Sequence, residues 1–378
     1  LRQYKMPTSS SRLSYPKLPP QPQRMAVWVF DASAANYINN SAEARSYAGT
    51  AFTIFETTSD YLYLGMEERF DLAIFFLTIA GEVGARTWEY YDGDSWDVFS
   101  PGIEYDFSED GGERFDRLLN WQTLLLSTTA PHTASSVPDQ IPRFWVRASV
   151  ASVTTSPTVL NMIMRPYASY STAKEVSEIL QLGYEFTADT IPSKSTVEDF
   201  IHNAQSFIDQ TSRKSWRPNI AYDEEHDFER AGTQLKRSYA TNVLKLQIWN
   251  GGSYDLKLQG REEDYFLVKD QNMIYYARFF ILPARIQSYG VWGFGHGEFS
   301  KAVRMTYVYG SNIWDNELEG GIVNDISKKM AAIDVFTSHD YSIIATSGAD
   351  RISLERKVDL WREETVEKAE NLRGWEVF

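Results

Sequence analysis

The chain has 378 residues with 43% hydrophobic and 23% charged residues, which is enough for about two or three globular domains. Its net charge of −14 argues against a protein that grips nucleic acid phosphates. It contains no cysteine, which excludes disulfides, thiolate zinc sites, iron–sulfur clusters and cysteine nucleophiles.

The first 24 residues predict an extended basic arm, because five prolines and five basic residues occur there with no acidic residue. Between Met25 and Tyr167 the balance reverses, to 8 basic and 19 acidic residues. The arm therefore has two interpretations that the residues leave open. It docks on its own acidic domain or a neighbouring subunit, or it is a disordered tail.

Residues 25–168 predict an all-β domain, a sandwich or jelly roll, because short aromatic and β-branched runs alternate with turn residues. Only the segment around Arg114–Leu119 suggests a helix. Asp92–Ser95 supplies a tight turn. The longest apolar run is too short to cross a bilayer and is typical of a buried strand. The predicted strands are Leu72–Ala80, Thr87–Tyr91, Phe144–Val150 and Val159–Met164.

Residues 169–218 predict helices. Thr172 and Glu175 form a capping-box pattern that opens a helix through Leu182. Ser195 and Glu198 form a second such pattern, which opens a helix to about residue 213 with one apolar stripe.

Residues 219–320 predict a β-rich insertion, with a hairpin of Val243–Trp249 and Tyr254–Leu258 joined by a glycine turn. Residues 290–297 form an aromatic loop rich in glycine. Residues 321–378 predict C-terminal helices, at about 322–336 and 352–373. The last helix carries one apolar stripe: Leu354, Val358, Trp361, Thr365, Ala369 and Leu372.

The residues that carry chemistry do not form a catalytic pattern. Asp223–Glu229 contains His226 among acidic residues, and we interpret it as a solvated charge run in a polar connector. Asp92, Asp94 and Asp97 lack the spacing of an EF-hand calcium loop, so we interpret them as a hairpin turn. The glycine-rich loop lacks the Lys-Ser/Thr of a phosphate loop. The sequence therefore predicts no enzyme, no catalytic residue, no cofactor and no metal site.

Residues from about 170 to 378 resemble the head–tail connector (adaptor) proteins of tailed viruses. The resemblance lies in Ser171–Gly183, in Phe186–Ser193, in the long helix that ends at Trp216, and in Arg304–Gly310 and Ile322–Tyr341. A separate similarity, to β-sandwich modules of virion baseplate and tail proteins, lies in Trp88–Trp96, Arg143–Ser149 and Val153–Pro157. A simple adaptor lacks such a module, so this part of the chain departs from the family pattern.

The resemblance implies an α+β multidomain fold. An N-terminal β sandwich would precede an α-helical adaptor domain that carries a hairpin-rich insertion. It implies a structural virion protein of the neck, assembled in the host cytoplasm. It also implies a homo-oligomeric ring, commonly of twelve copies, between the portal protein and the stopper or tail-completion protein. Such a ring lines the exit channel and lets double-stranded DNA pass without specific binding, which an acidic wall favours. The lack of cysteine suits assembly in a reducing cell. The resemblance implies no membrane partner.

Six residues are candidate contacts with the portal or a neighbouring subunit. Four belong to the stripe of the last helix, and two are aromatics of the glycine-rich loop. Each stripe residue is also explicable as ordinary intramolecular core. The candidates are Leu354, Val358, Trp361, Leu372, Trp292 and Phe294.

A different function remains possible, that of a carbohydrate-binding or tail-adhesion protein that uses the β-sandwich domain. Aromatic side chains on strands either stack on sugar rings or fill the core of the sandwich. The direction in which those side chains point decides between the two. The candidates are Trp88, Tyr90, Trp96 and Trp121.

Overall fold

The computed structural model describes most of the chain. The described residues are 25–46, 49–100, 105–115, 118, 121–124, 141–229, 232–250, 252–260, 262–277, 301–311, 313, 317–338 and 348–372, with the side chains of the last range described from 356 onward. The predicted arm of residues 1–24, the glycine-rich loop, and Trp292 and Phe294 within it lie outside the described residues.

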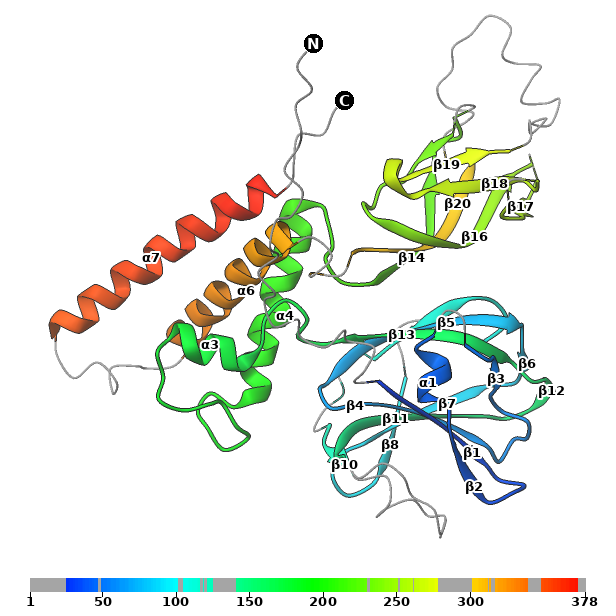
Figure 1. Ribbon diagram of the computed structural model, residues 1–378, viewed down its shortest axis with the longest axis horizontal. Helices are drawn as coiled ribbons and strands as arrows, with labels where there is room; N and C mark the ends of the chain where they lie inside the picture. Colours follow the sequence, from blue (N-terminus) through cyan, green and yellow to red (C-terminus); the bar gives the residue numbers. More distant parts are fainter. Residues whose placement is uncertain are drawn as a thin grey trace, which may run out of the picture.

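The described chain has an α+β fold, in which antiparallel sheets dominate and five α-helices occur within the described ranges. Figure 1 shows three regions: strands β1–β13, helices α3, α4, α6 and α7, and strands β14–β20. We call them the first β region, the helical region and the second β region. Among the described helices none is long and apolar enough to cross a membrane.

The first β region contains two main sheets and a small one. The larger sheet has the order β2 (Asn36–Asn39), β1 (Ala26–Asp31), β4 (Tyr61–Met66), β11 (Arg143–Val150), β7 (Arg86–Tyr91) and β8 (Trp96–Phe99), with β10 (Thr123–Leu124) beside β11. The second has the order β3 (Phe52–Thr53), β13 (Thr158–Pro166), β5 (Phe70–Ile79) and β9 (Gly111–Arg114). Strands β6 (Glu82–Val83) and β12 (Val153–Thr155) pair separately, and α1 (Ser41–Ala44) is a single turn.

A hydrophobic core fills the space between the two main sheets. Strand residues alternate between faces, so every second side chain of the larger sheet points inward, as Val27, Leu64 and Val146 do. Phe75 and Met162 of the second sheet meet them. All four predicted strands of this region are confirmed. The helix suggested around Arg114–Leu119 does not begin at Arg114, because Arg114 ends β9, which pairs with β5. Asp116, Arg117 and Leu119 lie outside the described residues.

The helical region contains α3 (Ala173–Ile179), α4 (Lys194–Ser212), α6 (Glu317–Ser338) and α7 (Gly348–Asn371). The predicted capping box of Thr172 and Glu175 is confirmed at the start of α3. The second predicted box is wrong. Ser193 caps α4 through Thr196, since Arg69 of the first β region binds both the Ser195 carbonyl and the Glu198 carboxylate.

The second β region contains two small sheets around a core of its own. One has the order β14 (Asn219–His226), β20 (Val303–Tyr309), β16 (Ala240–Trp249) and β17 (Tyr254–Lys257). The other has β15 (Thr233–Gln234), β19 (Met273–Tyr276) and β18 (Tyr265–Val268), with a 3₁₀ turn η2 (Lys269–Gln271) between β18 and β19. The predicted hairpin is confirmed as β16 and β17.

The interpretation of Asp223–Glu229 as a solvated charge run is wrong for its first half. Residues up to His226 form β14, and His226 is only 3% exposed. Strand alternation puts Glu224 and His226 on one face, with the His226 Nε2 3.0 Å from the Glu224 carboxylate. The Tyr307 hydroxyl donates to the same carboxylate at 2.5 Å. Because the Glu224 carboxylate contacts both His226 and Tyr307, these polar side chains can be buried on one face of the sheet.

The two β regions pack against each other through the outer face of the second sheet. Leu72, Ile74 and Phe76 of β5 contact Ile220 of β14 and Val308 of β20. Strand β5 is thus covered on both faces, which explains its continuous apolar run.

Candidate functional site

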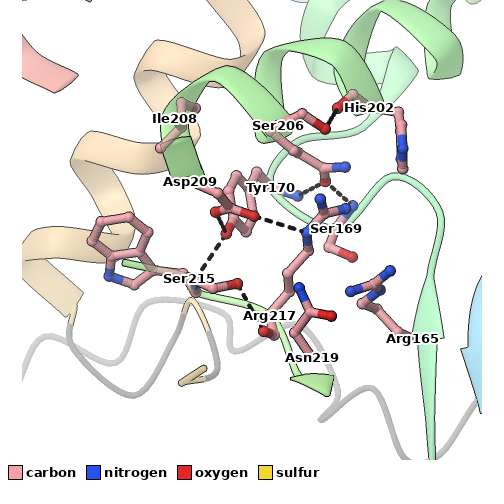
Figure 2. A network of polar contacts seen from close by, with 12 residues as sticks. Arg165, Ser169, Tyr170, His202, Ser206, Ile208, Asp209, Ser215, Arg217 and Asn219 are labelled. Atoms are coloured by element: carbon pink, nitrogen blue, oxygen red, sulfur yellow. Dashed lines mark hydrogen bonds and ion pairs between the residues drawn. The ribbon is translucent and has the colours of Figure 1, made fainter. Parts of the chain in front are cut away.

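A buried network of charged groups lies where the three regions meet, and Figure 2 shows the part of it around Asp209 and Arg217 from close by. At its centre Arg165 of β13 forms a two-pronged ion pair with Asp71 of β5, at 2.7 and 2.8 Å. The Asp71 side chain is 1% exposed and that of Arg165 is 5% exposed. The Arg165 Nη1 also donates to the Pro218 carbonyl at 3.1 Å, just before β14. One side chain therefore joins both β regions.

A second part of the network ties α4 to the segment that leads into β14. Asp209 of α4 accepts from the Arg217 guanidinium at 3.3 Å and from the Tyr170 hydroxyl. The same hydroxyl accepts from the Trp216 backbone N–H at 2.8 Å. The Trp216 indole N–H donates to Glu319 of α6 at 3.1 Å. The segment between α4 and β14 is thus bonded to two helices.

Arg69 makes a third link, from the turn between β4 and β5 to the first turns of α4. Its guanidinium donates to Glu198 at 2.9 Å and to Asp199 at 3.2 Å. It also lies 4.7 Å from the ring centroid of Tyr167. The Tyr167 ring in turn stacks on His202, with the centroids 4.1 Å apart. The Arg69 guanidinium, the Tyr167 ring and the His202 imidazole are thus in successive contact between the first β region and α4.

The network sets the charge states of its members. Burial disfavours the Asp71 anion, but Arg165 and then Arg217 outweigh it and hold the pKa of Asp71 below its ordinary value. Burial raises the pKa of Asp209, against the pull of Arg217. Burial, followed by the nearby Arg217 cation, lowers the pKa of His202, which favours the neutral imidazole. The two arginines therefore favour the anionic form of Asp71 in spite of its burial.

The junction also requires glycine at one backbone position. Gly310 follows β20 with a φ of +98°, in the region that side-chain-bearing residues rarely adopt. A Cβ there would stand 2.1 Å from the Arg217 carbonyl oxygen. The end of β20 can lie against the segment between α4 and β14 only because Gly310 has no side chain.

The charged groups of this junction join the three regions to one another. Its cations and anions are paired with each other or with backbone carbonyls, and buried pairs of this kind fix geometry. Among the described residues no three histidine or carboxylate side chains lie close enough to hold a metal ion. Asp92 is the anchor of a hairpin turn, since its carboxylate accepts from the backbone of Asp94 and Ser95.

The stripe on the last helix forms one face, as the spacing predicts, but that face packs inside the chain. Val358 and Trp361 contact Ala331 and Val335 of α6, and Trp361 is 9% exposed. Leu372 joins a second cluster with α4 and α6. Intramolecular core accounts for the burial of these three residues. Their contact with a partner stays a prediction, as does that of Leu354, Trp292 and Phe294, whose side chains are outside the described set.

The aromatic residues proposed for sugar stacking do not face outward. Trp88, Tyr90 and Trp121 lie in the core between the sheets and are less than 9% exposed. Trp96 belongs to a different cluster on the outer face of the larger sheet, where its ring stacks under Arg147 at 4.4 Å. The structure offers none of the four as an open stacking platform.

Sequence reasoning missed the junction entirely. Arg165 and Asp71 are 94 residues apart, and Arg69 and Glu198 are 129 apart. The available signal was a charged residue inside an otherwise apolar strand, which is true of both Asp71 and Arg165. A strand buried on both faces admits such residues only in pairs.

Comparison with known proteins gives little for this chain. No family model matches it, and no curated protein matches it. Solved structures that match in part include a chain of the neck of an empty GTA particle computed with C6 symmetry, and a chain of the virion of a native gene transfer agent (GTA) particle. Each is 15% identical, over 44% of this chain and 79% of the other, with TM-scores of 0.28 and 0.30. TM-scores of this size do not establish a shared fold.

Proposed function

We propose that the chain is a non-enzymatic structural protein of a virus-like particle. In this proposal it is a head–tail adaptor that forms a ring between the portal and the stopper or tail, in the neck of the particle. The domain boundaries predicted above, at residues 24, 168, 218 and 320, are part of the proposal. So are a twelve-fold ring and assembly in the host cytoplasm.

The main support for the proposal is that two separate segments of the chain form one helical region. Two chain segments about 100 residues apart build it: α3 and α4 come before the second β region, and α6 and α7 follow it. Val197 of α4 packs with Val335 of α6 and Trp361 of α7 in one cluster. A helical adaptor domain interrupted by a β-rich insertion is what the resemblance implies for residues 170–378.

The junction described above supports the same function. A ring repeats one subunit geometry, so each subunit must hold its regions at a fixed angle. Arg69, Arg165 and Arg217 each bind acidic groups across or beside a boundary between regions. Breaking any of these links would loosen the angle between regions, which a ring cannot tolerate.

The outward face of α7 is our proposed surface for contact with a neighbouring subunit or the portal. Leu360 is 58% exposed and Val366 is 44% exposed, while the opposite face of the helix is buried on α6. Leu354, Trp292 and Phe294 remain proposed contacts with a partner, as the sequence predicts. Val358, Trp361 and Leu372 then act by holding the helix in position.

The charge of the chain supports passage of DNA. A net charge of −14 repels a phosphate backbone, so a genome can slide through a ring without sticking. The purified chain should therefore fail to retard double-stranded DNA in a gel even at low salt. Retardation that falls steeply with added salt would contradict the proposed channel wall.

Electron microscopy and native mass spectrometry of the full chain, alone and mixed with a portal ring, test the proposal. We expect closed rings or a ring seated on the portal. Leu360→Glu should reduce ring or portal attachment and leave the melting temperature unchanged. Leu256→Glu, at a residue 59% exposed on β17, is the matched control and should assemble normally. A chain that stays monomeric and never joins a portal ring would overturn the proposal.

A further inference from the structure

A cavity of about 340 Å³ lies between the first and the second β region. Phe76 of β5 and Ile163 of β13 line it from the first β region, and Leu267 of β18 lines it from the second. All three side chains are apolar, so they give the cavity an apolar wall. Boundaries between packed regions are common places for ligand sites, and this volume is at the small end of their range. The cavity therefore suits a small molecule that has one apolar face.

Four polar side chains line the rest of the cavity, all of them from the second β region. Thr241 and Asn242 belong to β16, Gln259 follows β17, and Lys269 begins the turn η2. Gln259 and Lys269 are exposed, so a ligand can enter from solvent on their side. In the described part of the chain, the side chains of Asn242, Gln259 and Lys269 make no hydrogen bond or ion pair with another residue. These three polar groups are therefore available to a ligand.

The polar side chains define the chemistry of that ligand. The amides of Asn242 and Gln259 both donate and accept hydrogen bonds, as the hydroxyl groups of a sugar do. The Thr241 hydroxyl donates to the Val308 carbonyl at 3.3 Å and keeps its capacity to accept. A sugar ring also presents a face of C–H groups, which matches the apolar wall.

Lys269 adds a requirement for negative charge. It is the one charged residue among the seven that line the cavity. An ammonium group only donates hydrogen bonds, and a charge-assisted bond to a carboxylate is roughly twice as strong as a neutral one. The strongest match to Lys269 is therefore a carboxylate on the ligand.

We propose that this cavity binds a single sugar ring that carries a carboxylate, such as a uronic acid unit. Phe76, Ile163 and Leu267 contact one face of the ring. The two amides bond to its hydroxyl groups, and Lys269 pairs with its carboxylate. Because both β regions line the cavity, a bound ring would also hold these regions together. This proposal does not depend on the adaptor function.

Saturation-transfer NMR with the full chain tests the proposal, with glucuronate as the probe and glucose as its uncharged counterpart. A salt concentration of roughly 0.15 M screens the more distant acidic groups of the chain. We expect transfer to the ring protons of glucuronate, and a dissociation constant for glucose that is at least about threefold larger. Lys269→Met should weaken glucuronate binding roughly three- to tenfold and leave glucose binding unchanged. Gln259→Ala should weaken the binding of both sugars by about the same factor.

Two controls separate loss of binding from loss of structure. Gln259 and Lys269 are exposed, so both variants should keep the melting temperature of the wild-type chain. Lys174→Met is the matched control for Lys269→Met, because it removes an exposed ammonium in the helical region and changes the net charge equally. It should leave both dissociation constants unchanged.

Three results would each overturn the proposal. The first is a lack of saturation transfer to glucuronate at concentrations up to roughly 10 mM. The second is equal binding of glucose and glucuronate, or wild-type binding of glucuronate by Lys269→Met. The third is a loss of binding in Lys174→Met as large as that in Lys269→Met, which would make the binding a nonspecific response to charge.

Discussion

The ion pair between Arg165 and Asp71 makes the sharpest test of the junction. Arg165→Met leaves the Asp71 carboxylate in a site that is 1% exposed, without its two charge-assisted hydrogen bonds. The Pro218 carbonyl also loses its donor. Removing one partner of a buried ion pair costs about 3–5 kcal/mol, because the remaining charge stays desolvated and uncompensated. We expect a loss of that size in the free energy of unfolding.

The double variant Arg165→Met with Asp71→Leu removes both charges. It therefore separates the cost of one stranded charge from the contribution of the intact ion pair. An apolar pair of similar volume removes the stranded charge, and such replacements are often neutral or stabilising. We therefore expect the double variant to be at least about 2 kcal/mol more stable than Arg165→Met alone. Lys174→Met breaks an exposed pair with Glu185 and should leave stability unchanged.

Urea unfolding followed by tryptophan fluorescence measures these differences, since Trp216 lies within the junction. Hydrogen exchange of the backbone in β13 and α4 gives a local readout beside it. The reasoning is refuted if Arg165→Met costs less than about 1 kcal/mol, or if the double variant is as unstable as the single one.

Three further predictions concern other parts of the fold. Gly65→Ala places a Cβ 2.5 Å from the buried Trp145 ring, and should destabilise the first β region by more than about 1–3 kcal/mol in thermal melts. Glu224 has its pKa lowered to about 2 against burial, chiefly by His226. Because the folded pKa is the lower one, its stabilisation is complete above pH 4.5 and lost as pH falls towards 2. Glu224→Gln should flatten the fall of the melting temperature over that range. Trp361→Glu places a charge in the core of the helical region and should unfold that region, which circular dichroism would detect as a loss of helical signal. A native helical signal in this variant would show that Trp361 is not a core residue.

Local structure followed from short-range patterns. Short aromatic and β-branched runs between turn residues predicted β5, β7, β11 and β13, and the spacing of Thr172 and Glu175 predicted a capping box that the structure contains. The three- and four-residue spacing on the last helix predicted a single apolar face, which the structure also contains. Each of these features depends on residues within a few positions of one another.

The proposed partner contacts show what short-range patterns cannot predict. Spacing along a helix decides which side chains share a face, but it does not say what covers that face. The same stripe suits a portal subunit or the α6 helix of the chain itself, and the structure places Val358, Trp361 and Leu372 against the latter.

The sequence by itself determined the strands β5, β7, β11 and β13, the hairpin of β16 and β17, the acidic character of the chain and the apolar face of its last helix. Only the tertiary structure decided the junction of Asp71, Arg165 and Arg217, the pairing that buries His226, and the start of α4 at Ser193 rather than Ser195. Each of these depends on groups brought together from distant positions. A charged residue in an apolar strand indicates that it needs an oppositely charged partner, but only the folded structure shows which residue that partner is.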